Sequence, residues 1–377
     1  MRSTPALSFP SHVRTIALAA CAALLACGSD EEASTLETVD LAPEPPPQRR
    51  APGELFTRSR PMMGTVFIIN VDADEDVAEP AVRAAFDEIA RLETVLSEWR
   101  EDSEISRINR MAGREPVVVS DDVFTVVSAG VDVSRWSDGA FDLSWAALRG
   151  LYDFRRGQER IPTRADVRRR VGLIDWRQIE LDEEARTVFL KREGMAIGTG
   201  GIAKGYALDR AGTILRDAGI ESYMLFGGGQ VQVHGLRPRA EGPRPWRVGI
   251  QHPRRSDEYF GFFESRGGSI STSGDYEHFF IDDRGKRWHH ILDPRTGLPV
   301  DRTVSLTLTA PSGLYADALS TASFVLGPER ALEMLQRIEM HAEVIMLDQT
   351  CRLFATPGTM DKLILRVELS DGKVPGC

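Results

Sequence analysis

Hydrophobic residues recur at helical spacing in a few long segments of the chain and at alternating positions in many short ones. One amphipathic helix is expected to begin at Pro80. Its apolar residues share one face: Val82, Phe86, Ile89, Leu92 and Leu96. A second is expected from Asp121 to Trp136, with Ser120 as its N-terminal cap. Further helices are expected at residues 202–218, 315–325 and 328–338.

Short runs of β-branched and aromatic residues between turn residues predict strands over the rest of the chain. The first is GTVFIINV, residues 64–71, and TVFLKREGMAIG predicts a hairpin that turns at Glu193 and Gly194. The other expected strands are YMLF, VQVHG, WRVGI, SISTS, WHHIL, SLTLT, EVIML and LILRVEL. Because helices and strands do not alternate regularly, the expected fold class is α+β, with mostly antiparallel sheets and packed helices.

The N-terminal residues have the pattern of an export signal. Two arginines precede TIALAACAALLAC, an apolar stretch too short to span a bilayer. Its end resembles a bacterial lipobox, so residues 1–26 are expected to be a lipoprotein signal peptide and Cys27 to carry the lipid. The alternative is an ordinary signal peptide cleaved at small residues. Residues 27–60 are acidic, then proline-rich, then basic, which predicts a disordered tether before a folded domain of residues 61–377.

Charge and cysteine content narrow the possible partners. The chain has 377 residues and a formal net charge of -10, which argues against a nucleic-acid groove because phosphate backbones are bound by clustered Lys and Arg. If Cys21 leaves with the signal and Cys27 is lipidated, Cys351 and Cys377 remain. They either form a disulfide in an oxidising compartment, or Cys377 frays with the terminus.

A glycine-rich segment, IGTGGIAKGYALD, imitates a dinucleotide-binding loop. Gly198, Gly200 and Ala203 fit G-x-G-x-x-A, but a predicted hairpin, not a β-α-β unit, leads into it. A P-loop would need glycine where Ala203 stands and Ser or Thr where Gly205 stands. The segment instead suits a local anion site, because Lys204 lies at a predicted helix start. The alternative is a tight turn with a solvated lysine.

Two histidines could serve proton transfer. His289 and His290 are adjacent in a predicted strand, so their side chains should point to opposite faces. This disfavours a metal site built from both and favours one histidine as the proton-transfer group, with Asp293 nearby. The alternative is a half-buried histidine at a strand end.

A carboxylate and a hydroxyl share one face of the helix expected at residues 315–325. Asp317 and Thr321 are four residues apart, with Ser320 beside them. Hard oxygen ligands in this arrangement suit Mg²⁺. The alternative is that the aspartate complements the helix dipole while the threonine bonds back to a carbonyl.

Taken together, these segments resemble the ApbE family of bacterial FAD:protein FMN transferases over residues 60–337. The motifs that carry the resemblance are MMGTVF, LSEWREDSEISRIN, DGAFDLSWAALRGLYDF, GGIAKGYALD, FGGGQVQVHG, WRVGIQHP, SISTSGDYEHFF, HHILDPRTGLP and YADALSTASFVLG. The resemblance implies an ApbE-like, T-fold-related catalytic domain over residues 61–377. It also implies that FAD is the FMN donor, that Mg²⁺ grips its pyrophosphate, and that a threonine hydroxyl of a partner flavoprotein displaces AMP.

The resemblance also implies roles for individual residues. Gly201, through its carbonyl, Asp317 and Thr321 would hold Mg²⁺, and His290 would deprotonate the threonine. The FAD-binding positions would be Met63, Trp99, Ala140, Phe141, Asp142, Gly198, Lys204 and Ile291. The acceptor would be a flavoprotein subunit of a membrane redox complex. The enzyme would be lipid-anchored to the bacterial cell envelope, with its catalytic domain in the periplasm and no nucleic-acid partner.

Two residues depart from the family pattern. Gly198 stands where the family usually has an aspartate that contacts FAD, and Gln230 replaces the aspartate of a G-G-D motif. Losing one carboxylate hydrogen bond would cost about 1–3 kcal/mol of FAD binding. The metal and base positions match the family, so the expected activity is kept. Two alternatives remain at this point: an Mg²⁺-dependent FAD pyrophosphatase that uses water in place of threonine and releases FMN and AMP, and a non-catalytic FAD-binding lipoprotein, which Gly198 favours.

Overall fold

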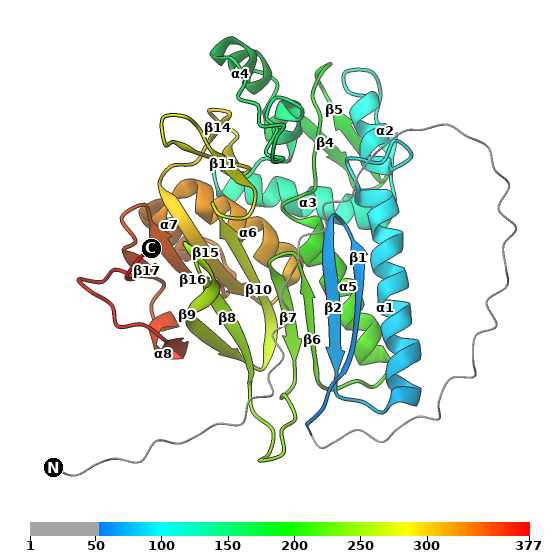
Figure 1. The fold of residues 1–377 in the computed structure, drawn as a ribbon. Coiled ribbons are helices and arrows are strands. Elements are labelled where there is room, and N and C mark those ends of the chain that lie inside the picture. Colours follow the sequence, from blue (N-terminus) through cyan, green and yellow to red (C-terminus); the bar gives the residue numbers. More distant parts are fainter. Residues whose placement is uncertain (1–52) are drawn as a thin grey trace, which may run out of the picture. The chain divides into compact units, whose positions relative to one another are not determined.

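The computed structural model describes residues 53–377, whose fold is α+β around one eight-stranded antiparallel sheet (Figure 1). The strand order is β1-β2-β6-β7-β10-β15-β16-β17. These strands are β1 (Phe56–Met62), β2 (Thr65–Val71), β6 (Tyr223–Gly227), β7 (Gln230–His234), β10 (Gly267–Gly274), β15 (Thr303–Ala310), β16 (Glu343–Asp348) and β17 (Leu353–Ala355).

Smaller sheets and hairpins surround this main sheet. One three-stranded sheet consists of β8 (Trp246–His252), β9 (Arg255–Ser265) and β18 (Leu363–Leu365), and another of β3 (Val117–Val118), β4 (Ile179–Asp182) and β5 (Thr187–Leu190). Two hairpins are β11 (Phe279–Ile281) with β12 (Arg287–His289), and β13 (Leu292–Asp293) with β14 (Leu298–Pro299).

Helices cover one face of the main sheet, where α5 packs between α1 and α6 (Figure 1). The helices are α1 (Glu75–Leu96), α2 (Glu104–Arg110), α3 (Asp121–Trp136), α4 (Arg164–Val171), α5 (Ala203–Asp217), α6 (Gly313–Leu326), α7 (Pro328–Arg337) and α8 (Thr359–Lys362). Two 3₁₀ turns are η1 (Leu143–Leu148) and η2 (Trp176–Gln178).

Strand β16 shows how both faces of the main sheet are buried. Val344 and Met346 belong to the large core on the helical side, whereas Ile345 and Leu347 pack with residues of β8, β9 and β18. Alternate residues of a strand point to opposite faces. A strand covered on both sides therefore reads as the uninterrupted apolar run EVIML.

Much of the local prediction is confirmed. Helix α3 has the expected bounds, and the Ser120 side chain accepts the backbone N–H of Val123 as its cap. Helices α5, α6 and α7 differ from the expected ranges by two residues or fewer at each end. Helix α1 begins at Glu75, five residues before the expected start, and contains Pro80 within it.

Other local predictions are wrong. The predicted hairpin around Glu193 does not form, because only its first half is a strand, β5, which pairs with β3 and β4. LILRVEL keeps strand structure only at Leu363–Leu365, and WHHIL is split between β12 and β13. The predicted tether extends too far, because residues 56–60 already belong to β1 and pair with β2. All seven residues of β1 pair with residues of β2, and this pairing, which composition does not reveal, makes the segment a strand.

The predicted signal peptide, Cys27 and most of the predicted tether lie outside the described residues. Within residues 53–377, no helix combines the length and the apolar character needed to cross a membrane.

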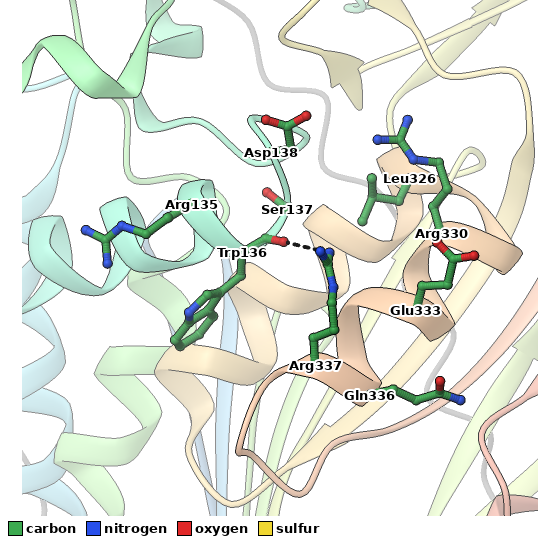
Figure 2. A pocket seen from close by; sticks show the side chains of 9 residues that line it. All are labelled: Arg135, Trp136, Ser137, Asp138, Leu326, Arg330, Glu333, Gln336 and Arg337. Atoms are coloured by element: carbon green, nitrogen blue, oxygen red, sulfur yellow. Dashed lines mark hydrogen bonds between the residues drawn. The ribbon is translucent and has the colours of Figure 1, made fainter.

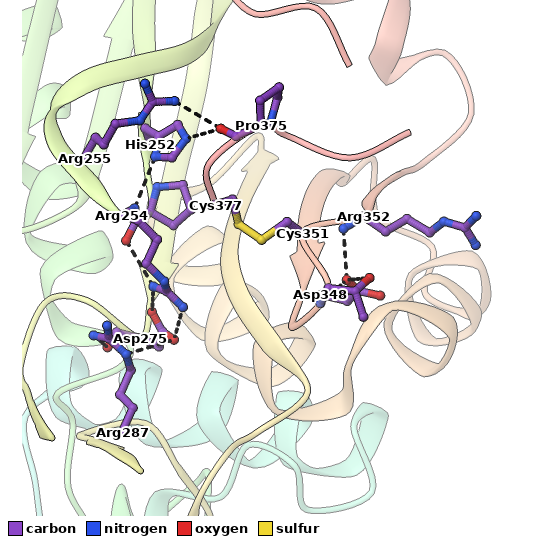
Figure 3. The surroundings of a disulfide bond; sticks show 12 residues. His252, Arg254, Arg255, Asp275, Arg287, Asp348, Cys351, Arg352, Pro375 and Cys377 are labelled. Carbon is purple, nitrogen blue, oxygen red and sulfur yellow. Dashed lines mark hydrogen bonds and ion pairs between the residues drawn. A yellow bond between two sulfur atoms is a disulfide. The ribbon is translucent and has the colours of Figure 1, made fainter. Parts of the chain in front are cut away.

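Cys351 and Cys377 form a disulfide, with their Cα atoms 5.6 Å apart (Figure 3). The carbonyl of Pro375, two residues before the C-terminus, accepts hydrogen bonds from Arg255 at 3.1 Å and interacts with His252 Nε2 at 3.0 Å. Val374 is 2% exposed in the core under β8 and β9. The C-terminal segment is therefore held in place, and the expected alternative of a fraying Cys377 does not apply.

Removing this disulfide should lower stability. We expect the double substitution Cys351→Ser and Cys377→Ser to decrease the free energy of unfolding by about 3 kcal/mol, because the bond closes a long loop in the unfolded chain. The two cysteines are 26 residues apart. Denaturant unfolding measures the change, and dithiothreitol should cause a similar decrease in the wild type but none in the variant. Equal stability of oxidised wild type and variant would contradict the prediction.

Candidate active site

The turn of residues 197–201 forms the centre of the candidate site, and distant segments fix its shape. The N–H of Ile197 donates to Asn109 Oδ1 at 2.7 Å, and the Asn109 amide donates back to the Ile197 carbonyl at 2.9 Å. The N–H of Gly198 donates to the carbonyl of Leu143 at 2.9 Å. No strand leads directly into this turn, as a dinucleotide fingerprint would require. The segment is therefore not a dinucleotide-binding loop, as predicted, although the hairpin predicted to precede it does not form.

Helix α5 starts directly after the turn and carries Lys204 in its first turn. The Lys204 ammonium donates to the carbonyl of Gly200 at 2.7 Å, so it lies over the glycine turn. The free N–H groups of a helix start and a nearby ammonium both attract anions. This arrangement suits the predicted anion site.

Two glycines bring α5 and α6 into backbone contact beside this turn. A Cβ on Gly205 would lie 1.9 Å from the carbonyl oxygen of Gly313, and a Cβ on Gly313 would lie 2.4 Å from the carbonyl oxygen of Gly205. Neither position has space for a side chain. The close approach lets Asp317 Oδ2 accept the N–H of Gly205 at 3.1 Å, so the α6 carboxylate lies at the start of α5.

The three predicted Mg²⁺ ligands lie close together. Asp317 is 4% exposed, and burial raises the pKa of its carboxyl group. A Cβ on Gly201 would lie 3.3 Å from Thr321 Oγ1, so the turn and α6 face each other there. Thr321 Oγ1 also lies 3.4 Å from the carbonyl of Asp317, the back-bonding expected as the alternative. A carboxylate, a hydroxyl and a backbone carbonyl are oxygen donors of the kind that Mg²⁺ prefers. Within residues 53–377, no cluster of three or more His, Cys, Asp or Glu side chains offers a different metal site.

Gln230 of β7 belongs to the same buried group. Its side-chain amide donates to Ser271 Oγ at 2.5 Å and hydrogen-bonds Asp317, while its Oε1 is buried without a partner among the described residues. A second carboxylate in this position would repel Asp317. With glutamine at position 230, where the family pattern has aspartate, Asp317 is the one carboxylate among these hydrogen-bonded side chains, and no second carboxylate repels it.

The two histidines point in different directions, as predicted. His289 is 2% exposed, and its Nε2 lies 2.6 Å from the carbonyl of Val300. The side chain of His290 is exposed, yet many protein atoms surround it, and its ring makes an edge contact with His278 at 5.2 Å between centroids. Loss of solvation, then the positive charges of His278, His289 and Lys204, lower the pKa of His290 below its usual value of 6.5. His290 can therefore be a neutral base near Lys204.

Asp293, expected near the histidine, is paired with arginines. Both carboxylate oxygens of Asp293 accept hydrogen bonds from Arg295, at 2.8 and 2.7 Å, and Arg302 lies 3.9 Å away. This bidentate pair stabilises the turn between β13 and β14. The backbone carbonyl of Asp293 also accepts hydrogen bonds within the turn, from the N–H groups of Thr296 and Gly297. His278, which the sequence did not single out, is the group that contacts the His290 ring.

The predicted FAD-binding positions surround the turn on several sides. Met63 has φ of 49° in the two-residue turn between β1 and β2, and a Cβ on neighbouring Gly228 would lie close to both Thr65 and the Lys204 side chain. Trp99 is 73% exposed, with the Arg149 guanidinium 5.2 Å from its ring. An exposed aromatic face of this kind can stack on a flat ring.

Other FAD-binding positions are buried and structurally engaged. Ala140 is fully buried, and a Cβ on Gly201 would lie 3.3 Å from the Phe141 ring. The Asp142 carboxylate accepts the N–H groups of Ser144 and Trp176, at 2.8 and 2.9 Å, and burial raises its pKa to about 6. Its carboxylate therefore caps η1. Ile291, 8% exposed, follows His290 and donates its N–H to His289 Nδ1 at 3.3 Å.

Glu98 is a site residue that sequence reasoning missed. It lies in the loop after α1, is 6% exposed, and its Oε2 accepts the N–H of Thr199 at 2.5 Å. Burial, the largest influence, raises the pKa of its carboxyl group, while the Thr199 N–H and the charge of Arg149 act in the opposite direction. In the sequence, a glutamate within LSEWRED has no signal that separates it from the exposed acids around it.

A separate pocket of about 660 Å³ lies between the end of α3 and α7 (Figure 2). Arg135, Arg330 and Arg337 line it, and Arg337 donates to the carbonyl of Trp136 at 3.5 Å. None of the predicted site residues lines this pocket. Its lining residue Leu326 ends α6, the helix that carries Asp317 and Thr321.

Comparisons with known proteins identify the relatives of this chain. The family model described as the ApbE family matches residues 63–346. The chain is 33% identical over 287 residues to the FAD:protein FMN transferase of Klebsiella pneumoniae (strain 342), covering 76% of this chain and 87% of that protein. It is 31% identical over 324 residues to that of Treponema pallidum (strain Nichols), covering 82% and 88%.

Solved structures show the same fold. The crystal structure of the ApbE protein from Thermotoga maritima superimposes with a TM-score of 0.74 at 28% identity, covering 82% of this chain and 99% of that one. The apo flavinyl transferase ApbE of Pseudomonas stutzeri gives a TM-score of 0.69 at 29% identity, covering 84% and 98%.

Proposed function

The chain belongs to the ApbE family, and from this membership we propose that it transfers FMN from FAD to a threonine hydroxyl of a partner flavoprotein, with release of AMP. The observation that supports the proposal is that Lys204, Gly201, Asp317 and Thr321 lie around one glycine turn, with His290 near enough for the Lys204 charge to lower its pKa. Phosphoryl transfer needs chiefly positioning and charge neutralisation, together with a base for the attacking hydroxyl.

In the proposed transfer, His290 handles the proton, and Lys204 and the start of α5 bind the phosphates. The neutral ring of His290 takes the proton of the threonine hydroxyl as the threonine oxygen bonds to the FMN-side phosphorus. The bond from that phosphorus to the bridging oxygen breaks, and AMP leaves with the bridging oxygen. Lys204 and the α5 N-terminus bind the phosphate oxygens. FMN is left joined to the acceptor as a phosphoester.

The metal part of the proposal concerns Mg²⁺. The Asp317 carboxylate, the Thr321 hydroxyl and the Gly201 carbonyl would hold it. When bound, Mg²⁺ supplies Lewis-acid neutralisation of the charge on the pyrophosphate. Asp317 suits this role because its buried carboxylate has no ion-pair partner among the described residues. A buried charge without a counter-ion is costly, and a cation removes that cost.

One incubation tests the proposal. The purified full-length chain is mixed with FAD, Mg²⁺ and a peptide that carries an accessible threonine, and AMP, free FMN and peptide mass are followed. A control peptide has valine in place of the threonine. A mass increase of FMN minus water, only on the threonine peptide and with stoichiometric AMP, supports the transferase. Free FMN and AMP without adduct would indicate a pyrophosphatase instead, and unchanged bound FAD a non-catalytic carrier.

The proposed setting is the bacterial cell envelope. Support comes from the apolar stretch that ends at Cys27, from the acidic and proline-rich residues after it, and from the Cys351–Cys377 disulfide, which suits an oxidising compartment. The acceptor would then be a flavoprotein subunit of a membrane redox complex. We expect Cys27→Ser to release the protein from the membrane fraction of cells. Membrane retention of that variant would contradict a lipid anchor at this residue.

A further inference from the structure

We propose that Glu98 supplies, from the loop after α1, the FAD-binding carboxylate that the family pattern places at position 198. The carboxylate would accept a hydrogen bond from a ring N–H, an amine or a hydroxyl of bound FAD. This inference rests on the proposed function, because it assigns a binding role within the same site.

The geometry shows that positions 98 and 198 share one space. A Cβ on Gly198 would lie 2.8 Å from Glu98 Oε2, and 3.0 Å from both its Cδ and its Oε1. Any side chain at 198 would therefore force the Glu98 carboxyl group to leave the position in which it accepts the N–H of Thr199. The glycine is the residue that lets the glutamate carboxylate occupy this space.

The surroundings of Glu98 fit a ligand-binding role better than a purely structural one. The carboxylate accepts the N–H groups of Thr199 and Gly200, but it forms no salt bridge among the described residues. The guanidinium of Arg149 donates to the Glu98 backbone carbonyl and lies over the Trp99 ring, so its charge lowers the pKa of the Glu98 carboxyl group without forming a salt bridge with it. Burying a carboxylate without an ion pair is unfavourable for folding alone.

The position of the loop gives Glu98 access to the same ligand as Trp99. Glu98 and Trp99 are adjacent in this loop. Arg149 contacts the Glu98 backbone carbonyl and the ring of Trp99, which is 73% exposed, and so anchors both residues. Glu98 also borders the turn over which Lys204 lies, and Lys204 is among the charges that influence its carboxyl group. A hydrogen-bond acceptor beside a stacking surface suits a flat ring with N–H or amine groups.

The test moves the carboxylate from one position to the other. Four forms of the full-length chain are compared: wild type, Glu98→Ala, Gly198→Asp, and the double variant with both substitutions. The dissociation constant for FAD is measured from flavin fluorescence with Mg²⁺ present and no acceptor, and the thermal midpoint is measured for each form. Glu101→Ala, which removes an exposed acid from the same loop, is the matched control.

We expect Glu98→Ala to weaken FAD binding roughly tenfold to a hundredfold, the size of a lost hydrogen bond to a charged group. Gly198→Asp alone should also weaken binding and lower the thermal midpoint, because two carboxylates then compete for one space. The double variant should bind FAD much more tightly than either single variant, while Glu101→Ala binds like the wild type. Titrations with FMN and with ADP identify which half of FAD loses the contact.

Unchanged FAD affinity in Glu98→Ala, with only a lower thermal midpoint, would mean that Glu98 merely anchors the glycine turn, and would overturn the inference. So would a folded double variant that binds no better than Glu98→Ala. If Glu98→Ala does not fold, the comparison of Glu98→Gln with the double variant decides in the same way. Failure of the wild type to bind FAD would instead reject the proposed function.

Discussion

Replacing His290 by alanine is expected to lower FMN transfer by about 10²–10⁴-fold, the range that a positioned general base contributes. FAD affinity should change little, because the role assigned to His290 is to accept the proton of the acceptor hydroxyl. Single-turnover transfer to the threonine peptide measures the rate, and fluorescence titration measures FAD binding. The exposed His341 provides the control, since His341→Ala should transfer at the wild-type rate. Transfer at that rate by the His290 variant would contradict the assignment.

The same assignment predicts the acid side of the pH profile. Because its surroundings lower the pKa of His290 below 6.5, the ring stays neutral and able to accept a proton to a lower pH than an ordinary histidine. In the free enzyme, kcat/KM reports the pKa of the essential base. We therefore expect kcat/KM to stay level from pH 8 to below pH 6.5. A loss of activity centred at or above pH 6.5 would show that His290 is not the titrating base, or that its pKa is not lowered.

Replacing Asp317 by asparagine should lower Mg²⁺-dependent transfer by at least about a hundredfold, because the substitution removes the charged ligand of a cation that supplies several kcal/mol. Without Mg²⁺, the variant should be as stable as the wild type or more so. Burial raises the pKa of Asp317, so its ionised form destabilises the fold at neutral pH and a neutral amide does not. Thermal unfolding with and without Mg²⁺ measures both effects, since Mg²⁺ should stabilise only the wild type.

A second buried carboxylate supplies the matched control. Asp209 accepts the N–H groups of Gly313 and Leu314, at 2.8 and 2.9 Å, and so links α5 to the start of α6 without belonging to the proposed metal ligands. Asp209→Asn should lower stability but leave the stabilisation by Mg²⁺ intact. Equal stabilisation of the Asp317→Asn variant and the wild type by Mg²⁺ would contradict the metal assignment.

Short-range patterns carried most of the correct predictions. Helix α3 was predicted to the residue because its cap, Ser120, and its apolar stripe are all contained in the segment itself. The paired strands β1 and β2 show the limit, because β1 (Phe56–Met62) is mostly exposed and reads as part of a polar tether. Its strand structure comes from pairing with β2, which composition does not reveal.

The site shows the same division. Asp317 and Thr321 could be identified together because they are one helical turn apart, and His289 and His290 because a strand alternates its faces. Nearness in sequence predicts Asp293 close to the histidine pair but does not reveal that its side chain binds Arg295. His278 escaped notice because only the β11–β12 hairpin region brings it against His290.

The sequence by itself determined the α+β class, most helices and strands, the family and the chemical groups of the candidate site, since each depends on local spacing or short motifs. Only the tertiary structure decided how those groups meet. Gly205 and Gly313 let α5 and α6 touch through their backbones and bring Asp317 to the start of α5. Gly198 leaves the space that Glu98 occupies, although 100 residues separate them. Such contacts depend on the packing of whole elements, which no local pattern encodes.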